Sequence, residues 1–331
     1  NMRKIDLHIH TISTVSDQDF DYSPASLQNY IQELALDAIA ITNHNFFDKN
    51  QYEDICRLTS ITVFPGIEVD IEKGHLLVIS NYADLDDFAG KCQKVQNLIK
   101  CENDYLSELQ FIEIFKNLDK YLLIPHYEKA PILDLKKVPK LAHYITCGEV
   151  NSIKKFESCR KATDRLVPVF FSDLRAKKDI ETYPSRCTYV DIDTISLANI
   201  RLALNDKSKV SLSATGGNHL IEILSNGLKI SSGLTVILGE RSSGKTHTLD
   251  LISKNVDDPK YIKQFSLVTK DADLDERKFE DILRTRCSSV ADDFFAEFKN
   301  VVDNIKGVNL DTDDKQIEDY IHLLFKSAED A

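Results

Sequence analysis

The chain has 331 residues, 42% hydrophobic and 28% charged, which is enough for two globular domains with buried cores. Its net charge of −12 argues against broad, nonspecific binding to nucleic acid or to an anionic membrane. No apolar run approaches the roughly 20 residues of a membrane-spanning helix. The strand-like N-terminal sequence predicts no signal peptide, and seven cysteines without a Cys-x-x-Cys pair predict reduced thiols in the cytoplasm.

The first 195 or so residues alternate short apolar, β-branched runs with helix-like stretches. The expected strands are residues 5–9, 38–42, 61–64, 76–79, 121–124, 144–146, 167–171 and 188–192. Helices are expected at residues 24–36, with Ser23 as the N-cap, and over residues 84–118. This alternation predicts a parallel sheet, and seven or eight strands in about 200 residues favour a compact (β/α) barrel over an open sheet.

A boundary between two domains is predicted at residues 211–218, where the sequence becomes small and polar. Residues 197–204 are expected to form the closing helix of the first domain, which we place at residues 2–212. The second domain, residues 218–331, begins with strand-like runs at 220–224 and 234–238, with a turn at Asn226-Gly227 between them. From Asp273 onwards the sequence is charged and helical in period. The apolar set of this tail is Phe279, Ile282 and Leu283.

Histidines and carboxylates recur at the ends of the expected strands. His8 and His10 share one face of the first strand because side chains alternate along a strand, and two imidazoles so placed can chelate one metal ion. The groups at the ends of later strands are His44, Glu68, His75, His126 and Asp173. In a (β/α) barrel the carboxyl ends of the strands meet on one face, so these groups are expected to converge.

The chemistry of this donor set points to hydrolysis of a phosphate ester. Imidazole and carboxylate donors together suit Zn, Mn or Fe better than Ca or Mg alone. A carboxylate such as Glu68 can bridge two ions about 4 Å apart, and such a pair promotes the displacement of a phosphoryl oxygen.

Five short motifs of the chain resemble those of the PHP (polymerase and histidinol phosphatase) family, in the order of that family. They are His8-Ile9-His10-Thr11, Thr42-Asn43-His44-Asn45, Gly66-Ile67-Glu68, Pro125-His126 and Ser172-Asp173. The resemblance covers about residues 2–210. It implies an α/β fold, a distorted (β/α)7 barrel, that holds up to three metal ions and acts as a metal-dependent phosphoesterase.

The resemblance also implies the ligands of these ions. One site would use His8, His10, Glu68 and Asp173. A second would share Glu68 and add His75 and His126.

The third site that the resemblance implies is altered in this chain. It would use Asp17, His44 and a histidine two residues after Asp173, but Arg175 stands there. A guanidinium does not ligate a metal ion. Either the third site is lost and Arg175, beside Asp17 and His44, acts as a catalytic phosphate clamp, or the barrel has drifted toward inactivity. The family also usually has aspartate where this chain has Asn43.

Two further observations bear on the barrel. Amidohydrolases also begin with His-x-His but often need a bridging lysine at a strand end, and we identify no lysine so placed. Glu149 and Asn151, which follow the sixth expected strand, resemble a polar pair common in the PHP family, and the sequence assigns them no role.

Residues 239–246 fit the phosphate-loop motif G-x-x-x-x-G-K-[ST] in full, between the expected strand 234–238 and an expected helix over residues 247–253. In such a loop Lys245 reaches the β- and γ-phosphates of ATP and Thr246 holds Mg. The surrounding stretch resembles the N-terminal lobe of SMC/ABC-type P-loop ATPases, with a glutamine at the position of their Q-loop. The expected nucleotide-binding residues are Gly239, Ser243, Gly244, Lys245, Thr246 and Gln264.

The leading hypothesis is a nuclease that cleaves DNA or RNA with two or three divalent ions and is regulated by ATP and Mg. No apolar strand ending in Asp-Glu follows residue 265, so hydrolysis of ATP by this chain alone is not expected. By fold-level analogy, such fusions belong to bacterial DNA repair or phage defence and form homodimers or larger assemblies through the ATPase part. The alternatives are a small-molecule phosphatase and a nucleotide-switched binding module with a degenerate barrel.

Overall fold

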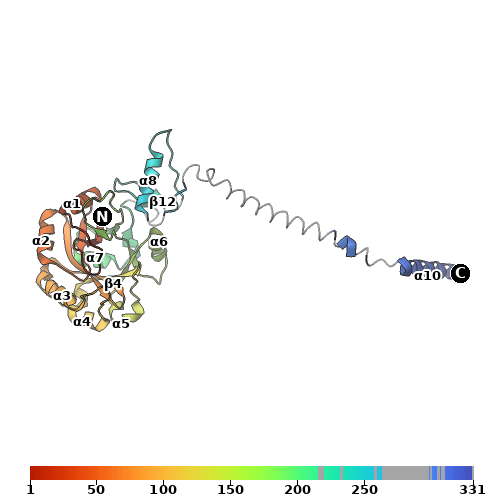
Figure 1. Cartoon of the computed structure of the whole chain (residues 1–331), viewed down its shortest axis with the longest axis horizontal. Coiled ribbons are helices and arrows are strands. Elements are labelled where there is room, and N and C mark those ends of the chain that lie inside the picture. Colours follow the sequence, from red (N-terminus) through yellow and green to blue (C-terminus); the bar gives the residue numbers. More distant parts are fainter. Residues whose placement is uncertain are drawn as a thin grey trace. The chain divides into compact units, whose positions relative to one another are not determined.

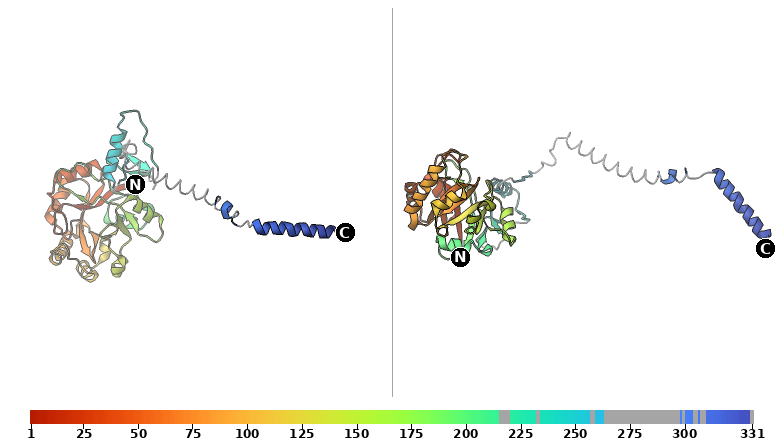
Figure 2. Two further views of the ribbon diagram at one scale, coloured as in Figure 1. Left: turned by 45° about the vertical axis from the view of Figure 1, so that its right-hand side comes forward. Right: turned by 90° about the horizontal axis from the view of Figure 1, so that it is seen from below.

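The computed structural model describes residues 1–214, 220–231, 234–256, 259–262, 298, 300–303, 306 and 310–329. The chain divides into two compact units, Asn1–Pro259 and Lys260–Ala331. The second unit contains α10 (Leu310–Glu329), which Figure 2 shows as one continuous helix. The predicted Q-loop residue Gln264 and the apolar set at residues 279–283 lie outside the described residues.

One mixed β-sheet organises the first unit. Its strands are β1 (Met2–His10), β2 (Ala38–Ile41), β3 (Thr62–Ile71), β4 (Gly74–Ile79), β5 (Leu122–Glu128), β6 (Cys147–Val150), β7 (Val167–Val169), β8 (Leu174–Arg175), β9 (Thr188–Asp191) and β10 (Val210–Ser211). They are hydrogen-bonded in the order β10-β9-β1-β2-β3-β4-β5-β6-β7, and β8 pairs with the end of β1. The Thr188 hydroxyl on β9 accepts from the Phe170 N–H (2.8 Å) and donates to the Phe170 carbonyl (3.0 Å), just after β7. These bonds join the two sides of the sheet into a nearly closed barrel.

Helices cover the outside of this barrel. They are α1 (Pro24–Glu33), α2 (Lys49–Leu58), α3 (Leu85–Leu98), α4 (Glu108–Phe115), α5 (Pro139–Ala142), α6 (Ile153–Lys161) and α7 (Leu197–Ala203), with short 3-10 turns at Tyr82–Asp84, Leu118–Lys120, Leu135–Lys137 and Lys207–Lys209. Figure 1 shows α1 to α6 following one another around the barrel in chain order. The Ser23 side chain caps α1 by accepting from the Ser26 N–H, which confirms the predicted N-cap.

The predicted order of strands and helices is confirmed in outline, but the sheet is not purely parallel. β3 turns back into β4 through Glu72 and Lys73, which have φ values of 47° and 66°, and a two-residue turn with both φ values positive joins antiparallel strands. β4–β5, β1–β9 and β9–β10 are antiparallel as well. This matters for the site because the start of β4 and the end of β3 lie at the same end of the barrel.

Two other element predictions are corrected. Residues 84–118 form α3 and α4 rather than one helix, because the Asp104 carboxylate accepts from the N–H groups of Lys100 and Cys101 and Ser107 begins a new helix with a capping box. The sixth strand is β6, not residues 144–146. Its four residues are buried, whereas Tyr144 is 47% exposed, so the apolar character of Tyr144 was misleading.

A small hairpin and a helix complete the first unit. β11 (Leu220–Glu222) pairs with β12 (Lys229–Ser231), and Gly227 at φ 81° confirms the predicted turn between them. Ile221 is buried in the barrel core, and Glu222 forms an ion pair of 2.9 Å with Lys4 Nζ on β1 and a hydrogen bond with the Tyr189 hydroxyl. The helix α8 (Lys245–Asn255) follows. Within the described ranges, none of the helices combines the length and apolar character that a bilayer crossing requires.

Candidate metal centre

The predicted strand-end residues converge at one end of the barrel. His8 and His10 project from the end of β1, Glu68 from β3 and His126 from β5. His75 lies at the start of β4, directly opposite Asp70 in the antiparallel β3–β4 pair. The hairpin therefore brings a histidine from the beginning of a strand to the same end as the others.

Glu68 lies at the centre of the cluster, and its two carboxylate oxygens face different imidazoles. Oε2 lies 3.0 Å from His8 Nε2, 3.3 Å from His10 Nε2 and 3.3 Å from His44 Nε2. Oε1 lies 2.7 Å from His75 Nδ1 and 3.1 Å from His126 Nε2. Glu68 is 1% exposed, so this carboxylate is positioned to serve two neighbouring sites at once.

Among the residues that the structure describes, five groups of three side chains have donor atoms close enough to hold one ion. They are His8–His10–Glu68, Glu68–His75–His126, His10–Asp17–His44, His44–Asp70–His75 and His8–His126–Glu149. The first two correspond to the two sites that the family resemblance implies, and Asp173 Oδ1 adds to the first at 3.0 Å from His10 Nε2. The third brings together Asp17 and His44, as expected.

Asp70 is a candidate ligand that the sequence analysis missed. Its Oδ1 lies 3.1 Å from His75 Nε2 and 4.0 Å from His44 Nδ1. A signal was present, because Asp70 is two residues beyond Glu68 on the same strand and therefore shares its face, as His8 and His10 do.

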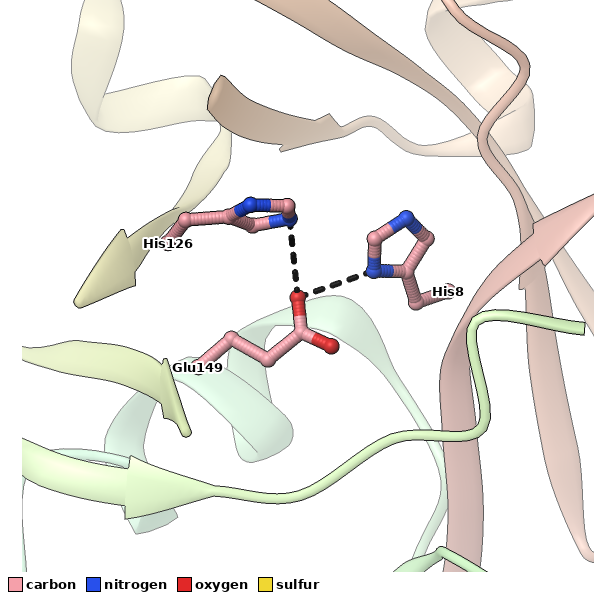
Figure 3. Close-up of side chains that lie close together, drawn as sticks. All are labelled: His8, His126 and Glu149. Atoms are coloured by element: carbon pink, nitrogen blue, oxygen red, sulfur yellow. Dashed lines mark hydrogen bonds and ion pairs between the residues drawn. The ribbon is translucent and has the colours of Figure 1, made fainter. Parts of the chain in front are cut away.

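Glu149 and Lys129 were also missed. Glu149, at the end of β6, is fully buried, and Figure 3 shows one of its oxygens between the rings of His8 and His126. That oxygen lies 2.8 Å from His8 Nδ1 and 3.4 Å from His126 Nε2. Lys129 directly follows β5, and its Nζ lies 2.9 Å from both Glu149 Oε1 and Asp173 Oδ2. The expectation that no lysine stands at a strand end is therefore wrong.

Arg175 on β8 lies against the His10–Asp17–His44 group. Its Nε donates to both oxygens of Asp17 (3.0 and 3.2 Å), and its Nη1 lies 2.6 Å from Asp173 Oδ1. A guanidinium thus already neutralises Asp17, the only carboxylate of the His10–Asp17–His44 group. Asn43, where the family usually has aspartate, accepts from the N–H groups of Thr11 and Ile12 and orders the loop after β1.

A buried network below the cluster positions Asp173. Asp6 on β1 accepts from the hydroxyls of Ser172 (2.5 Å) and Tyr30 (2.7 Å) and from the Ser172 N–H (3.2 Å). Asp173 then adopts a left-handed backbone conformation with φ 55°. Such a conformation is costly for a residue other than glycine, so the network is needed to aim this carboxylate at the cluster.

The charges of the cluster shift its titration strongly. Burial opposes the ionisation of Glu68, but the surrounding imidazoles, those of His44 and His8 first, hold its pKa well below the usual range. Burial acts against protonation of His8, but Glu149, Asp173 and Glu68 outweigh it and raise the pKa of His8 to about 10. Burial lowers the pKa of His44 to about 3. A proton on His8 therefore balances part of the carboxylate charge, and an ion that binds there releases it.

The residues fit divalent transition ions. The cluster has five carboxylates, namely Asp17, Glu68, Asp70, Glu149 and Asp173, against the fixed cations Lys129 and Arg175. Buried donors without a hydrogen-bond partner among the described residues are His10 Nδ1, His44 Nδ1, Asp70 Oδ1 and both ring nitrogens of His126. His126 Nε2 lies 3.1 Å from Glu68 Oε1 without the geometry of a hydrogen bond. Buried donors left unpaired beside excess negative charge are what a cation requires.

An open pocket of about 580 Å³ gives access to the cluster. The residues that line it include His44, Glu68, His75, His126 and Asp173 of the cluster, together with Asp17 and Arg175. A substrate in it would contact the cluster and the guanidinium of Arg175 together.

The phosphate loop and the segment before it, residues 234–238, are both described, and this segment differs from the expectation. α8 begins at Lys245, which confirms the predicted helix, and Ser242 and Gly244 adopt positive φ values of 65° and 88°. The Lys245 ammonium donates to the carbonyls of Gly239 (2.7 Å) and Glu240 (2.5 Å). Residues 234–238 form no strand, and Leu234 is 89% exposed. A strand needs hydrogen-bonded neighbours, and no described strand pairs with this segment.

Comparison with known proteins finds similarity to solved structures, two of which are described here. No protein-family model matches the sequence, and no curated protein matches it. A two-domain protein from Bacteroides vulgatus that contains a predicted PHP-like metal-dependent phosphoesterase is 18% identical, with a TM-score of 0.38, over 63% of this chain and 64% of that protein. A candidate metal-dependent phosphoesterase from Bifidobacterium adolescentis is 10% identical, with a TM-score of 0.37, over 60% of this chain and 95% of that protein. At these values neither similarity carries an argument about function, so the function rests on the site itself.

Proposed function

We propose that the barrel catalyses metal-dependent hydrolysis of phosphoesters. The observation that carries this proposal is the position of Glu68, whose two oxygens face separate sets of imidazoles at 2.7–3.3 Å. A buried carboxylate shared in this way is suited to bridge two divalent ions. Two ions bridged by one carboxylate would lie about 4 Å apart, and at that separation they would polarise a phosphoryl oxygen and lower the pKa of bound water.

The residues of the chain would hold these ions in two neighbouring positions. His8, His10 and Asp173 would complete one position, and His75 and His126 the other, with Glu68 common to both. Mn, Zn and Fe are the ions that best match this mixture of imidazole nitrogen and carboxylate oxygen. The barrel supplies the rigidity, because the five donors other than Asp173 lie on its hydrogen-bonded strands and Asp173 directly precedes β8.

Arg175 supports a phosphate as the group that binds in the pocket. Its side chain is 30% exposed at the pocket wall, while Asp17 and Asp173 hold the guanidinium in place. A guanidinium fixed in this way presents its outer N–H groups to an anionic oxygen and carries a permanent charge. We therefore assign Arg175 the role of orienting the phosphate, with Asp17 and His44 beside it.

We extend the proposal to a nucleic-acid phosphodiester as the substrate and to regulation by ATP with Mg at the phosphate loop. The support is the resemblance of the second segment to SMC/ABC-type ATPases and the geometry of residues 239–246, where a positive-φ glycine precedes the first turn of α8. An open pocket also accommodates a polymer better than an enclosed cavity would. If the substrate panel below shows activity on a small phosphate ester and none on nucleic acid, the protein is a small-molecule phosphatase and the extension to nucleic acid is wrong.

Metal content and a substrate panel test the proposal. The purified chain should contain about two transition ions, as the two-ion geometry requires, and a chain without ions would refute it. With Mn²⁺ added, single-stranded DNA, duplex DNA, RNA and p-nitrophenyl phosphate separate a nuclease from a phosphatase. His8→Ala should abolish the activity, whereas His143→Ala, which changes an exposed histidine outside the cluster, should not. Thermal unfolding of both variants checks that they fold, and His126→Asn repeats the test at a ligand of the second ion.

A further inference from the structure

Lys129 is a buried cation inside the candidate metal centre. Its side chain is 12% exposed, and its ammonium lies 2.9 Å from Glu149 Oε1, 2.9 Å from Asp173 Oδ2 and 3.1 Å from His8 Nδ1. The neighbouring Ala130 and Pro131 line the open pocket, but Lys129 does not. It therefore faces the carboxylates of the centre rather than a substrate.

Lys129 binds one oxygen of each of two carboxylates, those of Glu149 and Asp173. Glu149 Oε1 is bound to the ammonium, which leaves Oε2 between His8 and His126, as Figure 3 shows. Asp173 Oδ2 is bound to the same ammonium, which leaves Oδ1 directed at His10 Nε2. One ammonium thus binds one oxygen of each carboxylate. The other oxygen of Glu149 faces two imidazoles, and the other oxygen of Asp173 faces His10 and accepts from Arg175 Nη1 (2.6 Å).

The His8–His126–Glu149 group has the spacing of a metal site, but an ammonium already lies against it. An ion held by His8 Nδ1 and Glu149 at the usual ~2.0–2.2 Å would lie close to Lys129 Nζ, which approaches both of these ligands. Two positive charges so close together repel strongly in a buried site. Arg175 lies against Asp17 of the His10–Asp17–His44 group, but Lys129 is the cation that contacts two members of the His8–His126–Glu149 group.

Without an ion in that position, Glu149 has a different role. Glu149 Oε2, which can only accept, lies 2.8 Å from His8 Nδ1, and the opposite nitrogen, Nε2, lies 3.0 Å from Glu68 Oε2. The tautomer of His8 with its hydrogen on Nδ1 therefore donates to Glu149 and leaves Nε2 for an ion beside Glu68. A carboxylate that binds the far nitrogen of a ligating histidine fixes its tautomer and its orientation. Glu149 would be costly to bury as an anion on its own, and Lys129 compensates its charge.

We propose that Lys129 is a positioning residue that excludes a metal ion from the His8–His126–Glu149 group and keeps Glu149 as the hydrogen-bond acceptor that orients His8. This inference rests on the proposed function, because it assumes that ions bind around Glu68. It confines those ions to the groups that contain Glu68, His44 or Asp70.

The number of Mn²⁺ ions bound per chain tests this role directly. Wild-type chain and Lys129→Met are equilibrated with Mn²⁺, freed of excess ion by gel filtration and analysed for bound metal. Loss of the ammonium leaves Glu149 without a counter-ion, so Lys129→Met should bind about one ion more than the wild type, as buried carboxylates gain from metal binding. Lys129→Arg should restore the wild-type number. Lys155→Met is the matched control, since the Lys155 ammonium bonds, within the described part of the chain, to the backbone carbonyl of Glu128 (2.7 Å), the residue that precedes Lys129.

The same number in Lys129→Met and in the wild type would overturn the inference, and it would leave the proposed function intact as long as the wild type binds metal. A wild type without metal would instead overturn the proposed function. Glu149→Gln gives an independent measurement should Lys129→Met not fold. If Glu149 only orients His8, this variant keeps the wild-type number of ions at saturating Mn²⁺. If Glu149 is a ligand of its own ion, the variant loses one ion, and the inference is wrong.

Discussion

The metal-donor cluster and the phosphate loop differ in how the rest of the chain supports them. The cluster joins residues from His8 to Asp173, which belong to different strands, and its core members are almost completely buried. The phosphate loop joins neighbours in sequence, for Lys245 bonds to carbonyls only five and six residues away. On its N-terminal side Leu234 and Leu238 are 89% and 86% exposed.

The difference shows what a motif alone can determine. The glycine-rich loop can form its local turn and the first turn of α8 without a sheet around it. Within the cluster only the β3–β4 hairpin brings donors together locally, those of Glu68, Asp70 and His75, and the remaining donors reach Glu68 only when the barrel has closed. Activity at the barrel should therefore depend on single distant residues, while the loop should tolerate changes that leave its backbone intact.

The largest effect is expected from Glu68→Gln. The amide keeps the size of the side chain but loses the charge that faces five imidazoles, so both ion positions are weakened together. We expect the phosphoesterase activity to fall by on the order of 10³-fold, since removal of a single group that stabilises developing charge already costs 10²–10³. Activity and bound metal are measured together. Glu113→Gln, on the exposed side of α4, is the control, and equal activity in the two variants would contradict a bridging role for Glu68.

Removal of metal should reduce stability at the barrel and leave the loop unaffected. Free Mn²⁺ at about 100 times its dissociation constant should stabilise the folded chain by about 2.7 kcal/mol. For a unit of this size that corresponds to a rise in Tm of roughly 5–10 °C relative to chelator-treated protein. Lys245→Ala should show the same rise and His8→Ala a smaller one. A rise that depends on Lys245 would place the ion at the phosphate loop instead.

Much of the barrel and its site could be predicted from the sequence, because apolar runs ending in histidine or carboxylate mark strand ends. The eight predicted metal ligands do lie together in the structure. The pattern could not reveal in which direction a given side chain points. Lys129 after a strand resembles an ordinary solvated lysine, and only the path of β5 turns it toward Glu149 and Asp173. Likewise, the apolar residues 234–238 look like a strand, but a strand requires partners that local sequence does not contain.

A smaller effect is expected from Glu149→Gln. An amide at this position still contacts His8 but accepts a weaker hydrogen bond and leaves Lys129 with one fewer anionic partner. Loss of such an orienting partner typically costs about 10–100-fold in metal affinity or activity. Titration with Mn²⁺ measures the affinity. Glu128→Gln is the matched control, because Glu128 ends the adjacent strand and its carboxylate pairs with Arg165 among the described residues, away from the cluster. Equal affinities in the two variants would remove Glu149 from the centre.

The smallest effect is expected from Leu238→Ala, which tests whether the segment before the phosphate loop is supported by long-range packing. Leu238 is 86% exposed, so its truncation should change the free energy of unfolding by less than about 0.5 kcal/mol. Leu204→Ala is the reference, since Leu204 is fully buried in the barrel core and its truncation should cost about 2–5 kcal/mol. Denaturant unfolding of both variants gives the two values. If Leu238→Ala cost as much as Leu204→Ala, residues 234–238 would be packed as the predicted strand, and the phosphate loop would have the same kind of long-range support as the metal-donor cluster.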